Sequence, residues 1–304
     1  MVRRWWIYLR EVFRPGARTL FSLALYLGIQ LTIQSLRGKA PLEVTGDVGP
    51  GVLTLVLVLL YYRLSDEFKD AETDRLYFPE RPVPSGRVRL EDLRALLRLT
   101  VAALVALHAI WGRARLAFAA LLGFAWLMRR WFFLEGVLSR NRLLAFATHA
   151  PVSVIANVFV LAVYCNRTGE PLLARDALLV AVWFALPGYA WEIARKTRAP
   201  AEEQPGYQTY SGMLGARGSA LLALAFVGGH VAGFVAAAPR LAWSPALVLA
   251  VGAAAAGAGA VLLRFVADPD TGSRRLRPAT ELYGFVTAVA LIADLIARRG
   301  LVGA

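Results

Sequence analysis

The sequence predicts an all-α fold: a polytopic membrane bundle of about nine transmembrane helices. Of the 304 residues, 58% are hydrophobic and only 18% are charged, which is too apolar a balance for an ordinary soluble domain of this size. Mean hydropathy is +0.52. Apolar runs of about 15 to 23 residues recur along the chain, long enough to cross a hydrocarbon layer of roughly 30 Å. We therefore expect residues 1–304 to form a single integral-membrane domain.

Nine apolar runs mark the expected spans. The first follows a basic, amphipathic stretch at the N-terminus that lacks the pattern of a cleavable signal peptide. The expected spans are residues 18–36, 48–64, 93–111, 114–134, 143–165, 176–194, 218–238, 242–264 and 279–297.

Lys and Arg residues are distributed unevenly between the two sides that nine spans would define. The N-terminal tail and the loops on its side carry 24 of them, whereas the opposite side carries 9. Because cytoplasmic loops are enriched in positive charge, we expect a cytoplasmic N-terminus and an external C-terminus in the cytoplasmic membrane. The net charge of +13 is spread over short loops, which indicates contact with membrane lipid and argues against nucleic acid as a partner.

Three aspartates continue the second span and form the first candidate site. Asp66, Asp70 and Asp74 are spaced i, i+4, i+8, so on a helix they lie on one face, one turn apart. Three like charges in a row repel one another unless a cation lies among them. Mg²⁺ is suited to this place, because it binds a few carboxylates and completes its shell with water and phosphate oxygens. The alternative is a solvated helix end with Lys69 and Arg75 as ion-pair partners.

A basic turn follows the aspartates directly. The run from Arg81 to Arg87 reads Arg-Pro-Val-Pro-Ser-Gly-Arg, and its two prolines prevent the helix from continuing. The turn presents the guanidinium groups of Arg81 and Arg87, whose planar forks match phosphate oxygens. An acidic helix end beside a basic turn predicts a site for a metal ion and a diphosphate.

A second polar stretch, residues 192–215, follows the sixth span. Four spans separate it from the first stretch, so we expect both stretches on the cytoplasmic side, facing each other across one cavity. Its carboxylates are expected to share a metal, its basic groups to hold phosphate and its rings to lie near a reacting carbon. The candidates are Glu192, Glu202 and Glu203 as metal ligands, Lys196, Arg198 and, from another loop, Arg140 and Arg142 as phosphate ligands, and Tyr207 and Tyr210 as rings.

The first stretch resembles the signature of the UbiA superfamily of intramembrane prenyltransferases. That family's pattern is Asn-x-x-x-Asp-x-x-x-Asp, followed after about seven residues by Arg-Pro-x-x-Ser-Gly. Here the corresponding residues run from Asp66 through Asp70 to Asp74, and then from Arg81 to Gly86. The expected number of spans also fits, so the resemblance covers nearly the whole chain. Two departures are visible: Asp66 replaces the leading Asn, and the second acidic motif is reduced to glutamates across a Pro-rich insertion.

The resemblance implies a Mg²⁺-dependent transfer of a prenyl group from a prenyl diphosphate to an electron-rich, aromatic or lipid-like acceptor. The three aspartates and the glutamates would hold Mg²⁺ against the leaving diphosphate. Arg81, Arg87, Lys196 and Arg198 would bind its oxygens, and Tyr207 or Tyr210 would stabilise an allylic cation. The acceptor and the length of the prenyl chain are not implied.

Other classes of function predict different patterns of residues. A transporter would carry ionisable residues near the middle of its spans, whereas here they gather at the predicted cytoplasmic ends. No Gly lies between Asp66 and Asp74, which departs from the pattern of enzymes that use CDP-alcohols. Transfer from a phosphoribosyl donor on the same scaffold stays open, because the same metal and diphosphate contacts would serve it. The single cysteine, Cys165, excludes an intrachain disulfide and a thiolate metal cluster.

Overall fold

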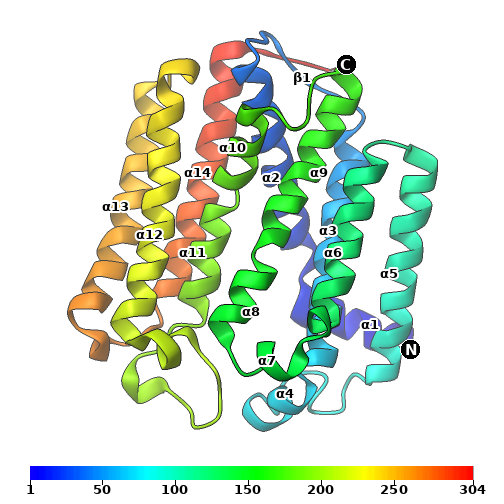
Figure 1. Ribbon diagram of the computed structural model, residues 1–304, viewed down its shortest axis with the longest axis vertical. Helices are drawn as coiled ribbons and strands as arrows, with labels where there is room; N and C mark the ends of the chain where they lie inside the picture. Colours follow the sequence, from blue (N-terminus) through cyan, green and yellow to red (C-terminus); the bar gives the residue numbers. More distant parts are fainter. Residues whose placement is uncertain (304) are drawn as a thin grey trace. The chain divides into compact units, whose positions relative to one another are not determined.

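The computed structural model describes residues 1–303, which are almost entirely helical, so the all-α membrane bundle is confirmed (Figure 1). The chain divides into two compact units. Unit 1 contains Met1–Leu23 and Gly46–Glu135, and unit 2 contains Ala24–Thr45 and the described residues from Gly136 onwards. Each unit is described by itself below.

Within residues 1–303, eight helical stretches are long and apolar enough to cross a membrane. The difference from the expected nine is helix α6, Arg115–Arg129, whose 15 residues extend about 22 Å at 1.5 Å per residue. The eight stretches are Pro15–Leu36, Val48–Lys69, Leu90–Trp111, Arg142–Thr168, Arg175–Arg195, Tyr210–Leu241, Pro245–Ala267 and Leu276–Arg299.

Unit 1 is built around the contacts that its N-terminal segment makes with two long helices. Trp5 donates from Nε1 to the carbonyl oxygen of Asp92 at 2.7 Å, and Arg4 forms an ion pair with the Asp92 carboxylate. The buried side chains of Tyr8 and Phe13 complete this attachment. The elements of this unit are α1 (Val2–Tyr8), η1 (Leu9–Phe13), the start of α2 (Pro15–Leu36), α3 (Val48–Lys69), α4 (Ala71–Tyr77), α5 (Leu90–Trp111), α6 and η2 (Trp131–Phe133).

Unit 2 contains a group of packed helices and a short parallel strand pair in which Leu42 is opposite Leu301. In Figure 1, α12, α13 and α14 lie side by side, with α11 against α12 and α14. The elements of this unit are β1 (Leu42–Val44), α7 (Glu135–Leu138), α8 (Arg142–His149), α9 (Pro151–Thr168), α10 (Arg175–Trp183), α11 (Leu186–Arg195), η3 (Pro200–Glu202), α12 (Tyr210–Leu241), α13 (Pro245–Ala267), η4 (Pro269–Thr271), α14 (Leu276–Arg299) and β2 (Leu301–Gly303).

One expected span, residues 143–165, is broken between α8 and α9, where Pro151 begins the second helix. A proline cannot donate to the turn before it, so carbonyl groups at the break need other partners. The Tyr189 hydroxyl donates to the carbonyl oxygen of Ala150 at 2.7 Å. The Ala150 carbonyl oxygen also accepts from the Ser153 amide at 3.1 Å, so Tyr189 of α11 is a second donor at the break and brings an aromatic side chain to it.

Helix α12 approaches the indole of Trp183 closely at Gly233. A Cβ atom at Gly233 would lie 2.6 Å from Trp183 Cδ1 and 2.9 Å from its Nε1. The same Nε1 donates to the carbonyl oxygen of His230 at 2.9 Å, which holds the ring in place. A glycine is therefore required at position 233 by the packing of α12 against α10.

We expect Gly233→Ala to lower the stability of the protein by about 1–3 kcal/mol, because the added methyl group must displace a buried, hydrogen-bonded indole. Thermal unfolding in detergent measures the effect. Gly228→Ala is the matched control on the same helix, because a Cβ atom there meets nothing within 4 Å. Equal unfolding temperatures for the two variants would contradict this account of the packing.

Candidate functional site

The three aspartates of the first stretch lie on one continuous path of helical hydrogen bonds. The amide of Asp70 donates to the carbonyl oxygen of Asp66 at 2.8 Å, and the amide of Asp74 donates to that of Asp70 at 2.7 Å. Asp70 itself lies between α3 and α4, with φ −99° and ψ 9°. Successive aspartates are therefore one helical turn apart, as their spacing predicts, although α3 ends and α4 begins on either side of Asp70.

The last aspartate is paired with the first arginine of the basic turn. Arg81 Nη1 lies 2.7 Å from Asp74 Oδ1, and the Asp74 side chain is only 9% exposed. The Arg81 guanidinium also stacks over the ring of Phe78, 3.8 Å from its centroid. Ser85 donates to the carbonyl oxygen of Arg81 at 2.7 Å, which closes the turn. Two predicted ligands, one for metal and one for phosphate, therefore neutralise each other.

The other members of this stretch have different surroundings. Arg87 Nη1 donates to both carboxylate oxygens of Glu11, at 2.8 and 2.9 Å, so it fastens the turn to η1. Asp70 has no side-chain hydrogen bond or ion pair with any residue among 1–303. Its carboxylate, one turn from that of Asp66, is the member of the row most available to a ligand.

A buried polar group beside this row was missed by the sequence analysis. Glu67, with a side chain 4% exposed, pairs with Arg63 at 2.5 Å, an i,i+4 spacing that was visible in the sequence. Tyr8 is fully buried near them. Burial, together with the Glu67 carboxylate, raises the pKa of Tyr8 well above its ordinary value, so the phenol stays protonated.

A hollow of about 480 Å³ lies at the end of α3 and α6, and it was also not predicted. Lys69 is held there by the Trp131 ring, 3.8 Å from its centroid, and by the carbonyl oxygen of Met128 at 3.2 Å. Residues 131–133 all have left-handed backbone conformations, with φ of 49°, 51° and 61°, a rare state for bulky side chains. The lining residues are Phe68, Lys69, Arg129, Arg130, Trp131, Phe133 and Glu135.

In unit 2, Glu192 is surrounded by basic side chains of its own helix end. Its Oε2 lies 2.5 Å from Arg195 Nε, and its Oε1 lies 3.5 Å from Lys196 Nζ. The Tyr210 hydroxyl donates to Glu192 Oε1 at 3.3 Å. Arg142, in the first turn of α8, attracts the Glu192 carboxylate electrostatically. Arg140, the predicted neighbour, is exposed in the turn before α8.

Glu202 joins two loops of unit 2. Its carboxylate accepts from the Ser273 hydroxyl at 2.5 Å, from the Ser273 amide at 3.2 Å and from the Ala199 amide at 3.0 Å. Although burial acts in the opposite direction, these hydrogen bonds hold the pKa of Glu202 below its ordinary value. The loop after α11 is thereby fastened to the loop after α13.

Glu203 and Arg198 are also committed to nearby protein groups. Thr209 donates to both Glu203 carboxylate oxygens, at 2.7 and 2.8 Å, while its own oxygen accepts from the amide of Gly212 and caps α12. Arg198 Nη1 donates to two backbone carbonyl oxygens, those of Arg195 and Thr197, each at 3.0 Å. The three predicted glutamates thus have three separate sets of partners.

The aromatic candidates differ in exposure. Tyr210 is 2% exposed and packs edge-on against Phe146, whereas Tyr207 is half-buried in a turn. Phe146 also contacts Tyr189 and Phe226, with ring centroids 5.7 and 6.0 Å apart. These four rings form an aromatic cluster beside Glu192, and three of its members were not identified from the sequence.

The two stretches differ in how well they suit a metal ion. Within residues 1–303, no three His, Cys, Asp or Glu side chains are grouped so that they could hold one. Mg²⁺ needs fewer, because it typically takes one or two carboxylates and completes its shell with water and substrate phosphates. Asp66 and Asp70 supply two carboxylates one helical turn apart, and the glutamates of unit 2 are hydrogen-bonded or ion-paired within their own unit.

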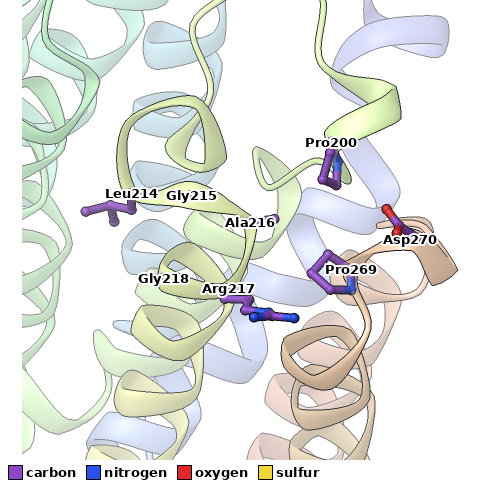
Figure 2. Close-up of a pocket in the computed structure, with 8 residues that line it drawn as sticks. All are labelled: Pro200, Leu214, Gly215, Ala216, Arg217, Gly218, Pro269 and Asp270. Carbon is purple, nitrogen blue, oxygen red and sulfur yellow. The ribbon is translucent and has the colours of Figure 1, made fainter.

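A second hollow, of about 400 Å³, lies at the end of α12 beside the Glu202 contact. Figure 2 shows Pro200 from η3 on one side of it, near Pro269 and Asp270 of η4, with Arg217 directed towards η4. Helix α12 is interrupted here at Gly215, where φ is 74° and ψ is 159°. None of the residues that line this hollow belongs to the predicted site.

Comparison with solved structures identifies the fold. A structure of digeranylgeranylglyceryl phosphate synthase matches with a TM-score of 0.64 and 14% identity, covering 97% of this chain and 99% of that one. The apo structure of a UbiA homologue from Aeropyrum pernix K1 matches with a TM-score of 0.59 and 18% identity, covering 92% and 97%. The fold that the resemblance implied is therefore confirmed. No protein-family model and no curated protein matched the sequence.

We expect Glu202→Gln to destabilise the protein by about 1–2 kcal/mol at pH 7, because a neutral amide replaces a carboxylate that accepts several hydrogen bonds. Since the pKa of Glu202 is lowered by folding, its contribution is complete above the ordinary pKa of 4.5 and is lost as pH falls through the lowered value. Unfolding temperatures measured across this range should converge for wild type and variant at low pH.

The control is Glu281→Gln, which removes an ion pair with Arg277 between side chains that are more than half exposed. Such a pair contributes about 0–1 kcal/mol. An effect of Glu202→Gln no larger than that of the control would show that the contact between the loops is not important for stability.

Proposed function

We propose that this protein is a UbiA-type intramembrane prenyltransferase. It would move a prenyl group from a prenyl diphosphate to an electron-rich acceptor, lipid-like or aromatic, with Mg²⁺ as cofactor. The observation that carries the proposal is the hydrogen-bonded row of Asp66, Asp70 and Asp74 at the end of α3, in a chain with this fold. The eight apolar helices support an integral-membrane setting for lipophilic substrates.

Asp66 and Asp70 would hold the Mg²⁺ in unit 1, since Asp74 is bound to Arg81. When bound there, the ion would neutralise charge that develops on the leaving diphosphate. Arg81 contributes indirectly, because its pairing with Asp74 relieves the repulsion within the row. On the same helix, the buried Glu67 carboxylate is paired with Arg63.

Basic side chains suited to phosphate oxygens occur in unit 1 and, separately, in unit 2. In unit 1, Lys69, Arg129 and Arg130 line a hollow that also has aromatic walls, a surface suited to an anionic group attached to an apolar chain. In unit 2, Lys196 and Arg195 lie at the end of α11.

The aromatic cluster would protect and stabilise the reacting carbon. Departure of the diphosphate leaves an allylic cation, and ring faces attract cations. Phe146, Tyr189 and Phe226 are partly exposed, so their faces are more accessible than that of the buried Tyr210. Surrounding apolar side chains would keep water from trapping the cation before the acceptor attacks.

The charge bias supports a cytoplasmic N-terminus and an external C-terminus in the cytoplasmic membrane. Epitope tags at the two ends test this orientation in intact cells. A protease added outside should remove a C-terminal tag and leave an N-terminal tag, and the reverse pattern would overturn the assignment.

The activity is tested with purified protein in detergent, isotope-labelled C10, C15 and C20 prenyl diphosphates and a membrane lipid extract as the source of acceptor. We expect a labelled prenylated product with Mg²⁺ and none with EDTA. Asp70→Asn should lower the rate at least 100-fold, because it removes a charged ligand from the row. Mass spectrometry identifies the product and hence the acceptor.

Glu72→Gln is the matched control, since Glu72 is exposed on the same turn of helix and belongs to no predicted site. It should retain the wild-type rate. Full activity of Asp70→Asn would remove the metal assignment, and product formed from a phosphoribosyl diphosphate instead of a prenyl diphosphate would replace the proposed donor.

A further inference from the structure

Helix α1 is held in one orientation at the end of α5 by its inward side chains. Arg4 is ion-paired with the Asp92 carboxylate, and Trp5 donates to the Asp92 carbonyl oxygen at 2.7 Å. The Tyr8 side chain is buried. Figure 1 shows α1 running crosswise to the long axis of α5. Because α5 is long and apolar enough to cross a membrane, a helix that lies across its end is parallel to the membrane surface.

The π-helical turn η1, which continues α1, is fastened to the same unit. Both carboxylate oxygens of Glu11 accept from Arg87 Nη1, and the Phe13 side chain is buried. Arg14 then ends η1 in a left-handed conformation, with φ of 55°, and α2 begins at Pro15. The segment formed by α1 and η1 therefore directly precedes a helix that is apolar and long enough to span a membrane.

The outward side of this segment combines apolar and basic side chains. Val2 is 72% exposed and Trp6 is 62% exposed. Arg3 and Arg10 are exposed on the same side, since they lie three residues before and four residues after Trp6. Neither guanidinium group has a hydrogen bond, ion pair or ring contact with any residue among 1–303. The segment thus pairs Arg4 with the protein and leaves two arginines beside an exposed indole.

This combination matches the headgroup layer of a membrane with an acidic surface. Indole rings are enriched at that depth, where the ring contacts apolar chains and the N–H group stays in a polar layer. Guanidinium groups bind phosphate oxygens through paired hydrogen bonds, and acidic lipids add electrostatic attraction. A helix face that met only water would typically carry polar residues where Val2 and Trp6 stand.

From this arrangement we infer that the outward face of α1 and η1 binds the surface of a membrane that contains acidic phospholipid. Val2 and Trp6 contact the glycerol and upper acyl region, while Arg3 and Arg10 contact phosphate oxygens. The ligand is a phospholipid whose headgroup carries a net negative charge, and neutral phosphatidylcholine is a weaker partner. The inference goes beyond the proposed prenyl transfer and does not depend on it.

Burial of this face is measured with a spin label at Val2→Cys, in the full-length protein in nanodiscs of phosphatidylcholine with or without phosphatidylglycerol. Cys165 is buried, so the introduced thiol is the reactive one. We expect phosphatidylglycerol to lower collisions with a water-soluble nickel complex about 3-fold, and high salt to reduce this difference by screening the attraction. Trp6→Ser should remove at least half of the protection. Equal accessibility of the label in the two lipids would overturn the inference.

The two arginines are tested by hydrogen exchange of the peptide that covers α1 and η1, with no cysteine introduced. We expect phosphatidylglycerol to slow its exchange about 5-fold in the wild type. In the double variant Arg3→Gln with Arg10→Gln, the lipid should change the rate less than about 2-fold, because the cationic contacts are gone. A lipid effect of wild-type size in the double variant would contradict the role given to the arginines.

The matched control is Arg274→Gln, which removes an exposed arginine without partners among residues 1–303 from a loop of unit 2. It should keep the full effect of phosphatidylglycerol on α1, and loss of the effect there would show that only net charge matters and refute the surface. In phosphatidylcholine alone, the double variant should exchange at the wild-type rate, because α1 stays attached through Arg4. A faster rate in that lipid would mean that the two arginines hold α1 to the protein, and the inference fails.

Discussion

The ion pair between Asp74 and Arg81 is the constraint on which the rest of the first stretch depends. The Asp74 carboxylate is only 9% exposed, so losing its cationic partner would leave a largely buried charge unpaired, at a cost to stability. The pair folds the proline-rich turn back onto α4 and reduces the negative charge of the row. Asp66 and Asp70 lie one turn apart on the same row, and Mg²⁺ commonly takes one or two carboxylates from a protein.

The carboxylates of the two acidic stretches have different surroundings. In unit 1, regular helical spacing keeps three carboxylates on consecutive turns, and the Asp74–Arg81 ion pair offsets part of their charge. In unit 2, prolines interrupt the chain after α11, and the insertion folds onto the loop after α13 through Glu202. Each glutamate then finds a donor or a cation close by. A metal-binding motif and a loop contact can therefore contain the same residue types and differ only in what surrounds them.

Breaks in the membrane helices contribute to the proposed site as well as to the fold. At the interruption at Pro151, the Ala150 carbonyl oxygen accepts from the Ser153 amide and also from the Tyr189 hydroxyl. This hydrogen bond orients a ring that packs against Phe146 and Phe226. An aromatic cluster beside charged residues in an apolar bundle is suited to a reaction that passes through a cation and must exclude water.

The sequence by itself determined the features that arise within one helix or one turn. Apolar length predicted the long helices, the four-residue spacing predicted the aspartate row, and the prolines predicted the turn at 81–87. The fourth expected span, residues 114–134, was predicted too long, because the left-handed aromatic turn at 131–133 that follows α6 has no local sequence signal. Only the tertiary structure decided the partners, since Arg87 meets Glu11 and Glu202 meets Ser273 across more than 70 residues of chain. Spacing sets which side chains share a helix face, but packing between distant segments decides which charges remain available for a ligand.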